Sequence, residues 1–443
     1  MATIILQPSS SSENLQIAIN NAVPGVNTII VVSSDIVFTG VVIVPADRII
    51  TLVADGNWTL IGSSGNAFTV NGILNLGEEN PSFNGNLTIT GFTNSAIRVT
   101  SGGIFTMYGG VISGNMSESG GGVSIIGGTF NMAAGLISNN IAGIGGGVHV
   151  CQVSTNIFNM TGGIISGNEA TNGSVGGGGV AMFGGEFNMS GDASIENNIV
   201  SGSGGGIYIS LSISSFNMNG NARIANNEAV FLGGGIVSLS GASTNIYGGE
   251  ISGNTARSGG GISVSLGSVG VYGGEIADNG AKNGGGIWVD ETATADISGN
   301  SVIINNNAVN GNGGGIYNLG SVGISGNAEI SNNRATYDGN GQGGGIYTDD
   351  FNRLTVIGPR VKFANNRADF ATEREPANDA VYATHILNME GNWTVPFQQG
   401  YNNFDINQNG TRIEPEDDCL KIILLLLIMF CRPKKRCCCK KYW

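Results

Sequence analysis

The chain has 443 residues, of which 75 are glycine, 41% are hydrophobic and only 12% are charged. Glycine without a three-residue period excludes collagen, and the apolar content excludes a disordered glycine-rich linker. All 32 acidic residues lie in residues 1–418, whereas seven of the 19 basic residues lie in residues 419–443. An acidic body repels phosphate groups, so we expect no nucleic-acid partner.

The first 28 residues are predicted to form an N-terminal cap. A short helix is indicated by an N-cap at Ser12, an apolar face of Leu15, Ile19 and Ala22, and a stop signal at Pro24-Gly25. Such a helix would protect the strand edges that the first coil of a repetitive β-structure leaves open. These residues show neither the charged region nor the long apolar run of a secretory signal peptide.

Three marks repeat over residues 100–385. Glycine triplets precede aliphatic residues spaced 25 to 32 apart: Val123, Val148, Val180, Ile207, Ile236, Ile262, Ile287, Ile316 and Ile346. An apolar residue followed three positions later by asparagine ends at Asn115, Asn140, Asn168, Asn198, Asn227, Asn254, Asn279, Asn306, Asn333 and Asn366. Pairs of apolar residues two apart form the third mark: Phe105/Met107, Phe130/Met132, Phe158/Met160, Phe187/Met189 and Phe216/Met218, continued by Ile246, Val271, Ile297, Ile324 and Val356.

These marks predict an all-β fold, a parallel β-helix over residues 29–395. Short apolar segments bounded by glycine, asparagine and serine are typical of strands, and one repeat cannot bury its apolar face without a neighbour. We expect about 11–12 coils at the usual strand spacing of roughly 4.8 Å, with three strands per coil. Glycine suits corners with positive φ or close approach, and asparagine suits turns and hydrogen bonds between coils. Residues 396–418 are predicted to be an exit segment.

The glycine and asparagine marks resemble the repeats of the polymorphic membrane protein family, whose signatures are Gly-Gly-Ala-Ile and Phe-x-x-Asn. Gly315 and Gly345 stand where that family has alanine, and Phe363 and Asn366 match its second signature. The array is also similar to adhesin-like, pectin-lyase-like proteins that form right-handed parallel β-helices. The resemblance implies a surface-displayed or extracellular passenger that takes part in attachment. The signal peptide and C-terminal barrel that accompany that family are not visible here.

Parallel β-helices also include enzymes that cleave acidic polysaccharides with clustered carboxylates and basic groups. The segment Arg360–Lys362 is similar to the Arg-x-Lys clamp of polygalacturonases, but the aspartate pair and His-Gly motif of that family are missing. Asp349 and Asp350 are adjacent, so in a strand they point to opposite faces. His149 and His385 lie apart and are each predicted to be surface or satisfied residues. We therefore predict no catalytic site, no bound metal and no cofactor.

Four aromatic residues are the candidate ligand-facing side chains. Each follows the aliphatic residue after a glycine triplet: Tyr208, Trp288, Tyr317 and Tyr347. If the aliphatic residue faces the core, alternation turns the aromatic one outward, into one column. Exposed aromatic rings stack on sugars, whereas ordinary cross-strand packing is the alternative interpretation.

Residues 419–443 differ in composition from the rest of the chain. The apolar run Ile422–Phe430 has nine residues, about half of the ~20 that span a bilayer. Basic residues around Cys437, Cys438 and Cys439 are typical of lipidated segments that contact an anionic membrane surface. A frameshifted reading frame would give the same abrupt change. Both interpretations stay open, and a metal site at these adjacent cysteines is disfavoured by geometry.

The sequence thus predicts a non-enzymatic, adhesin-like β-helix that binds glycan, matrix or host-surface ligands. The alternatives are a carbohydrate-active β-helix enzyme, such as a polysaccharide lyase, a hydrolase or a tailspike-like protein, and a structural coat or scaffold protein.

Overall fold

The structure is a computed structural model that describes residues 2–79, 81–357, 360–369 and 405–406. The chain divides into two compact units, Met1–Gly410 and Thr411–Trp443, and every described residue lies in the first. The tail with its three adjacent cysteines therefore lies outside the described residues, as do His385 and residues 370–395 of the predicted β-helix.

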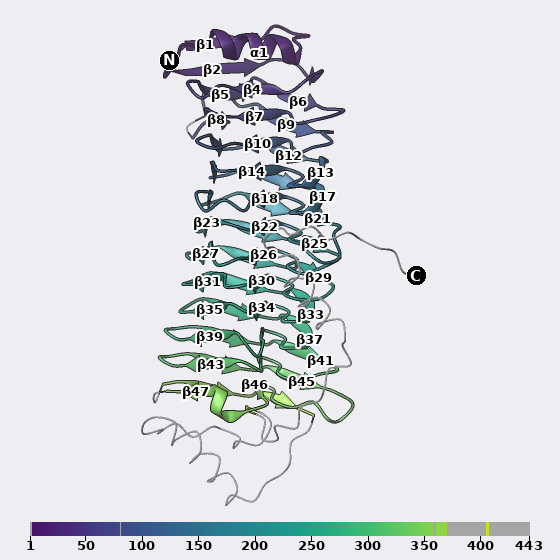
Figure 1. The fold of residues 1–443 in the computed structure, drawn as a ribbon, viewed down its shortest axis with the longest axis vertical. Coiled ribbons are helices and arrows are strands. Elements are labelled where there is room, and N and C mark those ends of the chain that lie inside the picture. Colours follow the sequence, from purple (N-terminus) through teal and green to yellow (C-terminus); the bar gives the residue numbers. More distant parts are fainter. Residues whose placement is uncertain (1, 80, 358–359, 370–404, 407–443) are drawn as a thin grey trace, which may run out of the picture. The chain divides into compact units, whose positions relative to one another are not determined.

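The first unit is a parallel β-solenoid of about 13 turns, which confirms the predicted fold class with slightly more coils than expected (Figure 1). Corresponding strands of successive coils pair in register and build four parallel sheets of 14, 13, 12 and 10 strands, here called A, B, C and D in that order.

Sheet A comprises β1 (Ala2–Ile5), β2 (Asn27–Val32), β5 (Ile49–Ala54), β8 (Ile73–Leu76), β11 (Ile104–Met107), β15 (Thr129–Met132), β19 (Ile157–Met160), β23 (Gly185–Met189), β27 (Ser214–Met218), β31 (Ser243–Ile246), β35 (Ser268–Val271), β39 (Thr294–Ile297), β43 (Ser321–Ile324) and β47 (Leu354–Val356). Sheet C comprises β4 (Val42–Val44), β7 (Phe68–Val70), β10 (Ile97–Val99), β14 (Val123–Ile125), β18 (Val148–Val150), β22 (Val180–Met182), β26 (Ile207–Ser210), β30 (Ile236–Leu239), β34 (Ile262–Ser265), β38 (Ile287–Val289), β42 (Ile316–Asn318) and β46 (Ile346–Thr348). Sheet B runs from β3 (Ile36–Val37) to β44 (Glu329–Ser331) and β48 (Lys362–Ala364), and sheet D from β13 (Met116–Ser119) to β49 (Arg367–Ala368).

Sheet D adds a fourth strand to most coils, whereas three strands per coil were predicted. It begins only at β13, and its strands follow the buried asparagine of each coil. Many of its core-facing residues are alanines, such as Ala170, Ala229 and Ala308, each with at most 4% of its surface exposed. Alanine carries little strand signal. The expected pattern of large alternating apolar residues is therefore absent from these strands, although their backbones pair.

The N-terminal cap is a helix, α1 (Ser12–Asn21), and its N-cap is Ser11 rather than the predicted Ser12. Ser11 and Asn14 form a capping box, in which the Ser11 hydroxyl accepts from the Asn14 backbone N–H. Leu15 and Ile19 are fully buried, as the apolar face of the helix predicts. The helix packs on β4, and β1 adds one further strand to sheet A by pairing with β2.

The interior is built from columns of identical side chains. Five phenylalanines on β11 to β27 are fully buried: Phe105, Phe130, Phe158, Phe187 and Phe216. Their successive ring centroids lie 5.1, 4.9, 4.3 and 5.0 Å apart. Offset-stacked rings at this separation gain attraction beyond the area they bury. The predicted aromatic column is therefore the core of these coils.

A second column consists of buried amides between sheets B and D. Ten asparagines, each at most 1% exposed, occupy it: Asn115, Asn140, Asn168, Asn198, Asn227, Asn254, Asn279, Asn306, Asn333 and Asn366. Asn198 is typical: its Nδ2 donates to Asn227 Oδ1 at 3.0 Å and to the Ile165 carbonyl at 3.0 Å, and its backbone N–H donates to the same Oδ1. Each amide thereby connects three successive coils, as the expected hydrogen bonds between coils require.

Left-handed backbone occurs one residue before this column. Asn197, Asn226 and Asn305 have φ near +55°, whereas the buried asparagines that follow them do not have positive φ. Asparagine tolerates this conformation better than other side-chain-bearing residues. The sequence pattern had placed the left-handed turn on the buried asparagine, so the turn lies one residue earlier than expected.

The glycine triplet serves two separate purposes at its first and third positions. Gly313 has φ of +68°, which glycine adopts without a steric penalty. Gly315 has no positive φ, but an added Cβ would lie 2.6 Å from the Gly345 carbonyl oxygen and 3.1 Å from the Asn333 amide. The triplet therefore makes room for the asparagine column and for the backbone of the next coil.

Removal of one amide from the buried column is expected to destabilise the solenoid strongly. Asn227→Ala would leave the Asn198 amide and the Ile195 carbonyl without their partners, at about 1–3 kcal/mol for each buried group. Asn221→Ala, an exposed asparagine bonded to Asp192, is the matched control and should change stability by less than about 0.5 kcal/mol. Urea-denaturation midpoints test both, and equal midpoints would contradict this role of the column.

A crowded glycine of the triplet and a strand glycine with open surroundings should respond oppositely to an added methyl group. Gly315→Ala pushes against backbone and is expected to cost about 1–3 kcal/mol. Gly323→Ala, in β43, meets no atom within 4 Å and should be neutral or stabilise by up to about 1 kcal/mol, because glycine in a strand costs conformational entropy. Thermal unfolding of the two variants would refute the packing argument if both were equally tolerated.

Candidate functional site

The four predicted ligand-facing aromatics lie on the side of sheet C that faces away from the core. Their neighbours Ile207 and Ile316 belong to the core cluster, whereas Tyr208 and Tyr317 do not. Register aligns Trp288 with Tyr317 and Tyr317 with Tyr347, and the last two rings stack with centroids 4.8 Å apart. Three of the four rings are thus consecutive in register, whereas Val237 and Ser263 separate Tyr208 from them.

These aromatics nevertheless expose almost no surface. The exposed fractions are 1% for Tyr208, 5% for Trp288, 3% for Tyr317 and 0% for Tyr347. A ring that stacks on a ligand must present a face to solvent. The expected outward direction is thus present, and the four residues stay predicted ligand-facing side chains. More accessible aromatic rings lie on sheet A.

The predicted acidic and basic candidates lie on different sheets. Asp349 and Asp350 follow β46 of sheet C, and an Asp350 carboxylate oxygen accepts from the Asn352 backbone N–H. Lys362 lies in β48 of sheet B, where its Nζ is 2.9 Å from Glu329 Oε1. Burial acts to raise the pKa of Glu329, but hydrogen bonds from Lys362 and Ser331 together with the Lys362 charge hold this pKa below its usual range. Both groups serve local structure, and no group of three metal-ligating side chains occurs among the described residues.

His149 and Cys151 form the one thiol–imidazole contact in the described part of the chain, at 3.5 Å between Sγ and Nδ1. Burial lowers the pKa of His149 to about 4, and burial raises the pKa of the Cys151 thiol. Both shifts favour the neutral pair over a thiolate and imidazolium. A reactive cysteine needs the opposite shift, so this contact is a packing feature.

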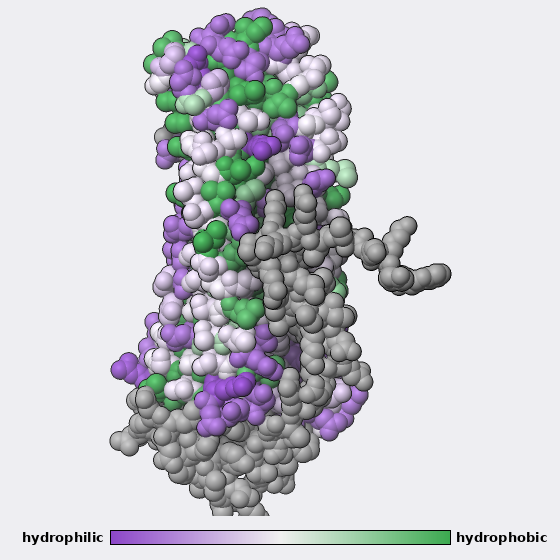
Figure 2. Space-filling model, in the orientation of Figure 1, coloured by the Kyte–Doolittle hydropathy of each residue, from purple (hydrophilic) through white to green (hydrophobic). Residues whose placement is uncertain are grey.

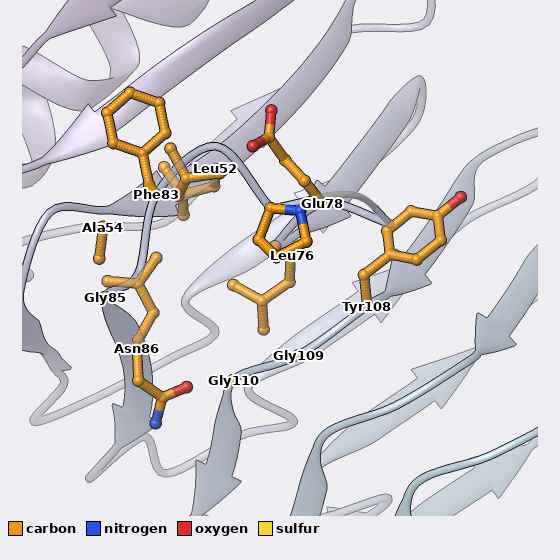
Figure 3. Close-up of a pocket in the computed structure, with 14 residues that line it drawn as sticks. Leu52, Ala54, Leu76, Glu78, Phe83, Gly85, Asn86, Tyr108, Gly109 and Gly110 are labelled. Carbon is orange, nitrogen blue, oxygen red and sulfur yellow. The ribbon is translucent and has the colours of Figure 1, made fainter.

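A small cavity lies beneath the loop between β8 and β9 (Asn86–Thr90) (Figure 3). Its volume is about 140 Å³, and Leu76, Phe83 and Tyr108 line it together with one carboxylate, Glu78. The Glu78 carboxylate accepts from the Ser82 backbone N–H at 2.9 Å and so fixes the loop. Ligand pockets usually have about 300–1,000 Å³, so this cavity is too small for a drug-sized molecule.

The outer face of sheet A carries a column of half-buried amides. It contains Asn131, Asn159, Asn188, Asn217 and Asn245, at equivalent positions of β15 to β31. The Nδ2 of each of the last four donates to the Oδ1 of the preceding amide, at 2.9, 3.2, 3.0 and 3.1 Å along the column. A side-chain amide has two N–H groups and a carbonyl with two lone pairs. The column therefore retains hydrogen-bonding capacity toward solvent.

Two tyrosines continue this column. Gly270 is the next residue in register after Asn245, and an added Cβ at Gly270 would lie 2.4 Å from the Tyr272 ring. The Tyr272 ring thus covers the position that a further asparagine would occupy. Tyr247 stacks on Tyr272 with ring centroids 5.4 Å apart, and the two side chains are 54% and 37% exposed. These are accessible aromatic rings next to an amide column.

A hydroxyl column runs beside the tyrosines and amides. Ser215, Ser243, Ser268, Thr294 and Ser321 follow one another in register on β27 to β43. No lysine or arginine lies in the described strands of sheet A. Glu186 and Asp296 are the acidic residues in these two columns. Burial, followed by the charge of Asp296, raises the pKa of Tyr272, so its hydroxyl stays protonated. We call the two columns and the tyrosine pair the sheet A face.

The sequence analysis missed the tyrosine pair, although a signal exists. The segment Tyr-Gly-Gly-Glu occurs at Tyr247 and again at Tyr272, one residue beyond the last apolar position of β31 and β35. Alternation places such a residue on the outer face. The predicted ligand-facing aromatics are instead those that follow the glycine triplets.

Comparisons with protein-family models, with curated proteins and with solved structures find no match. The only helix of useful length in the described residues, α1, is too short and too polar to cross a membrane.

Proposed function

We propose that this protein is a non-enzymatic binding protein whose ligand is a neutral polysaccharide held on the sheet A face. The observation that carries the proposal is the accessible Tyr247–Tyr272 pair in line with five hydrogen-bonded amides. Sugar rings present C–H faces that pack on aromatic rings and hydroxyls that bond to amides. Equivalent side chains recur from coil to coil, which suits a ligand that is itself a repeating chain.

Charge on this face favours a neutral ligand over an acidic one. An acidic polysaccharide would meet Glu186 and Asp296 without a basic partner on the described strands of sheet A, and like charges at an interface are repulsive. The charge of −13 on the whole chain acts in the same direction at longer range. Tailspike-like or pectinolytic enzymes instead need basic groups beside clustered carboxylates.

Display at a cell surface is part of the proposal, and it is supported by the resemblance of the repeats to adhesin-like passengers. Protease shaving of intact native cells tests it: peptides from residues 100–385 should appear in the medium without lysis. If the intact protein is found only inside the cells, an internal scaffold role would be favoured over a role in attachment.

Loss of the tyrosine pair is expected to weaken polysaccharide binding. The double change Tyr247→Ser and Tyr272→Ser should lower the affinity for a soluble neutral glucan at least about tenfold, which is ~1.4 kcal/mol, in affinity electrophoresis. Tyr337→Ser is the matched control, because Tyr337 lies in the turn after β45 (Arg334–Thr336) of sheet D, away from sheet A.

Three results would refute the proposal. The wild-type protein could ignore a panel of neutral glucans, mannans and xylans, it could prefer polygalacturonate, or the control could lose as much affinity as the double variant. The appearance of new reducing ends during incubation would show an enzyme. Concentration-dependent self-association without glycan binding would favour a coat or scaffold role.

A further inference from the structure

The buried asparagine column ends at a carboxyl group. Asn366, the last amide, donates through Nδ2 to Asp405 Oδ1 at 2.8 Å. Every earlier amide donates to the Oδ1 of the next asparagine, as Asn333 does to Asn366 at 3.0 Å. Asp405 is 1% exposed and thus as inaccessible as the asparagines themselves. It occupies the place of an eleventh asparagine.

Asp405 reaches that place from the backbone position of a triplet glycine. The Ile346 N–H donates to the Asp405 carbonyl at 2.6 Å, as the Ile316 N–H donates to the Gly345 carbonyl at 2.8 Å one coil earlier. A Cβ on Gly345 would point at the Asn366 amide, 3.1 Å away. A side chain at the equivalent position of the next coil therefore points into the asparagine column. Ile406 then pairs with Ile346 as a parallel bridge.

Only one of the two Asp405 carboxyl oxygens has a hydrogen-bond partner. Its Oδ2 is buried and makes no hydrogen bond. The described group that bonds to the carboxyl is neutral: it is the Asn366 amide, just before β49. Arg367, the next residue in β49, is exposed. A buried carboxylate without a cationic partner is costly, whereas a protonated carboxyl is not.

We propose that Asp405 is an acid-strengthened latch that holds residues 405–406 on the last coil, where they pair with Ile346 of β46. The neutral carboxyl fits the end of the asparagine column, and its ionisation favours release of this segment. Release removes the Asp405 carbonyl that accepts from the Ile346 N–H, and a freed strand donor of this kind is able to pair with another strand.

The direction of the pH dependence follows from linkage. Burial raises the pKa of Asp405 from 3.8 to about 6, and the Asn366 hydrogen bond only partly opposes this. The released segment loses its proton near pH 4, whereas the docked one keeps it up to pH 6. Docking of residues 405–406 is therefore strongest below pH 4 and weakens as the pH rises from 4 to 6. Above pH 6 the docking equilibrium no longer changes with pH. A shift of about two units corresponds to a roughly 100-fold change in the docking equilibrium.

Hydrogen exchange on the full chain tests the latch. The readout is the protection of the Ile346 amide divided by that of the Ile316 amide, which removes the intrinsic pH dependence of exchange. In the wild type this ratio should fall by up to about 100-fold between pH 4 and pH 7. In Asp405→Asn it should stay high throughout, because asparagine completes the amide column. Asp338→Asn, an exposed aspartate, should behave like the wild type.

Asp405→Ala gives a second check, since it should lower the ratio at every pH while leaving Ile316 protected. A wild-type ratio that is constant from pH 4 to pH 7 would overturn the latch. The same pH dependence in wild type and Asp405→Asn, or poor protection of Ile346 in Asp405→Asn at all pH values, would overturn it as well.

Discussion

The structure depends on the hydrogen bonds of the buried asparagine column. A side-chain amide in a protein interior is expensive unless its donors and its acceptor are all satisfied. Asn198 meets this condition only because Asn227 and Ile165 stand at the same height in the neighbouring coils. The column therefore fixes the register of each coil on the next. A shift of one coil by one residue relative to the next would leave several buried polar groups without hydrogen-bond partners.

The other repeated features follow from that constraint. Gly315 has no side chain because the Asn333 amide and the next backbone occupy its surroundings. The left-handed residue before each asparagine, such as Asn305, turns the chain so that the amide points inward. The phenylalanine column fills the volume that is left, with ring separations set by the coil spacing. The high glycine content and the high asparagine content are thus linked, because the glycines make room for the buried amides.

A polar column also has to end, and its two ends differ. At the N-terminal end, Asn115 Oδ1 accepts from the Phe92 backbone N–H at 3.1 Å, so an ordinary amide satisfies it. At the other end the last donor, Asn366, needs an acceptor, and Asp405 supplies one. Figure 2 shows hydrophobic and hydrophilic side chains mixed at the N-terminal end, where Ile17, Val37 and Ile43 are 45–60% exposed.

The sequence was sufficient for the fold because its marks are large, apolar or conformationally special residues that recur at fixed spacing. Phe130 and Asn140 identify their columns without any structure. Sheet D escaped prediction because alanine carries almost no pattern. The Tyr247–Tyr272 pair escaped prediction because the aromatic residues singled out in the sequence were those that follow the glycine triplets. Tyr317 faces outward and is 3% exposed, whereas Tyr247 faces outward and is 54% exposed.

The outward columns of sheet A call for a different explanation from the inward ones. Core volume dictates Phe187 and amide satisfaction dictates Asn198, but neither requirement reaches the outer surface. The outer amides gain some stability from hydrogen bonds such as that between Asn188 and Asn159, worth about 1 kcal/mol net. The Tyr272 ring covers Gly270 and stacks on Tyr247, yet the two tyrosines still leave about a third to a half of their surface in water. Exposed aromatic area is unfavourable for a free solenoid. Its position at the end of an amide column is therefore the basis of the proposed recognition role.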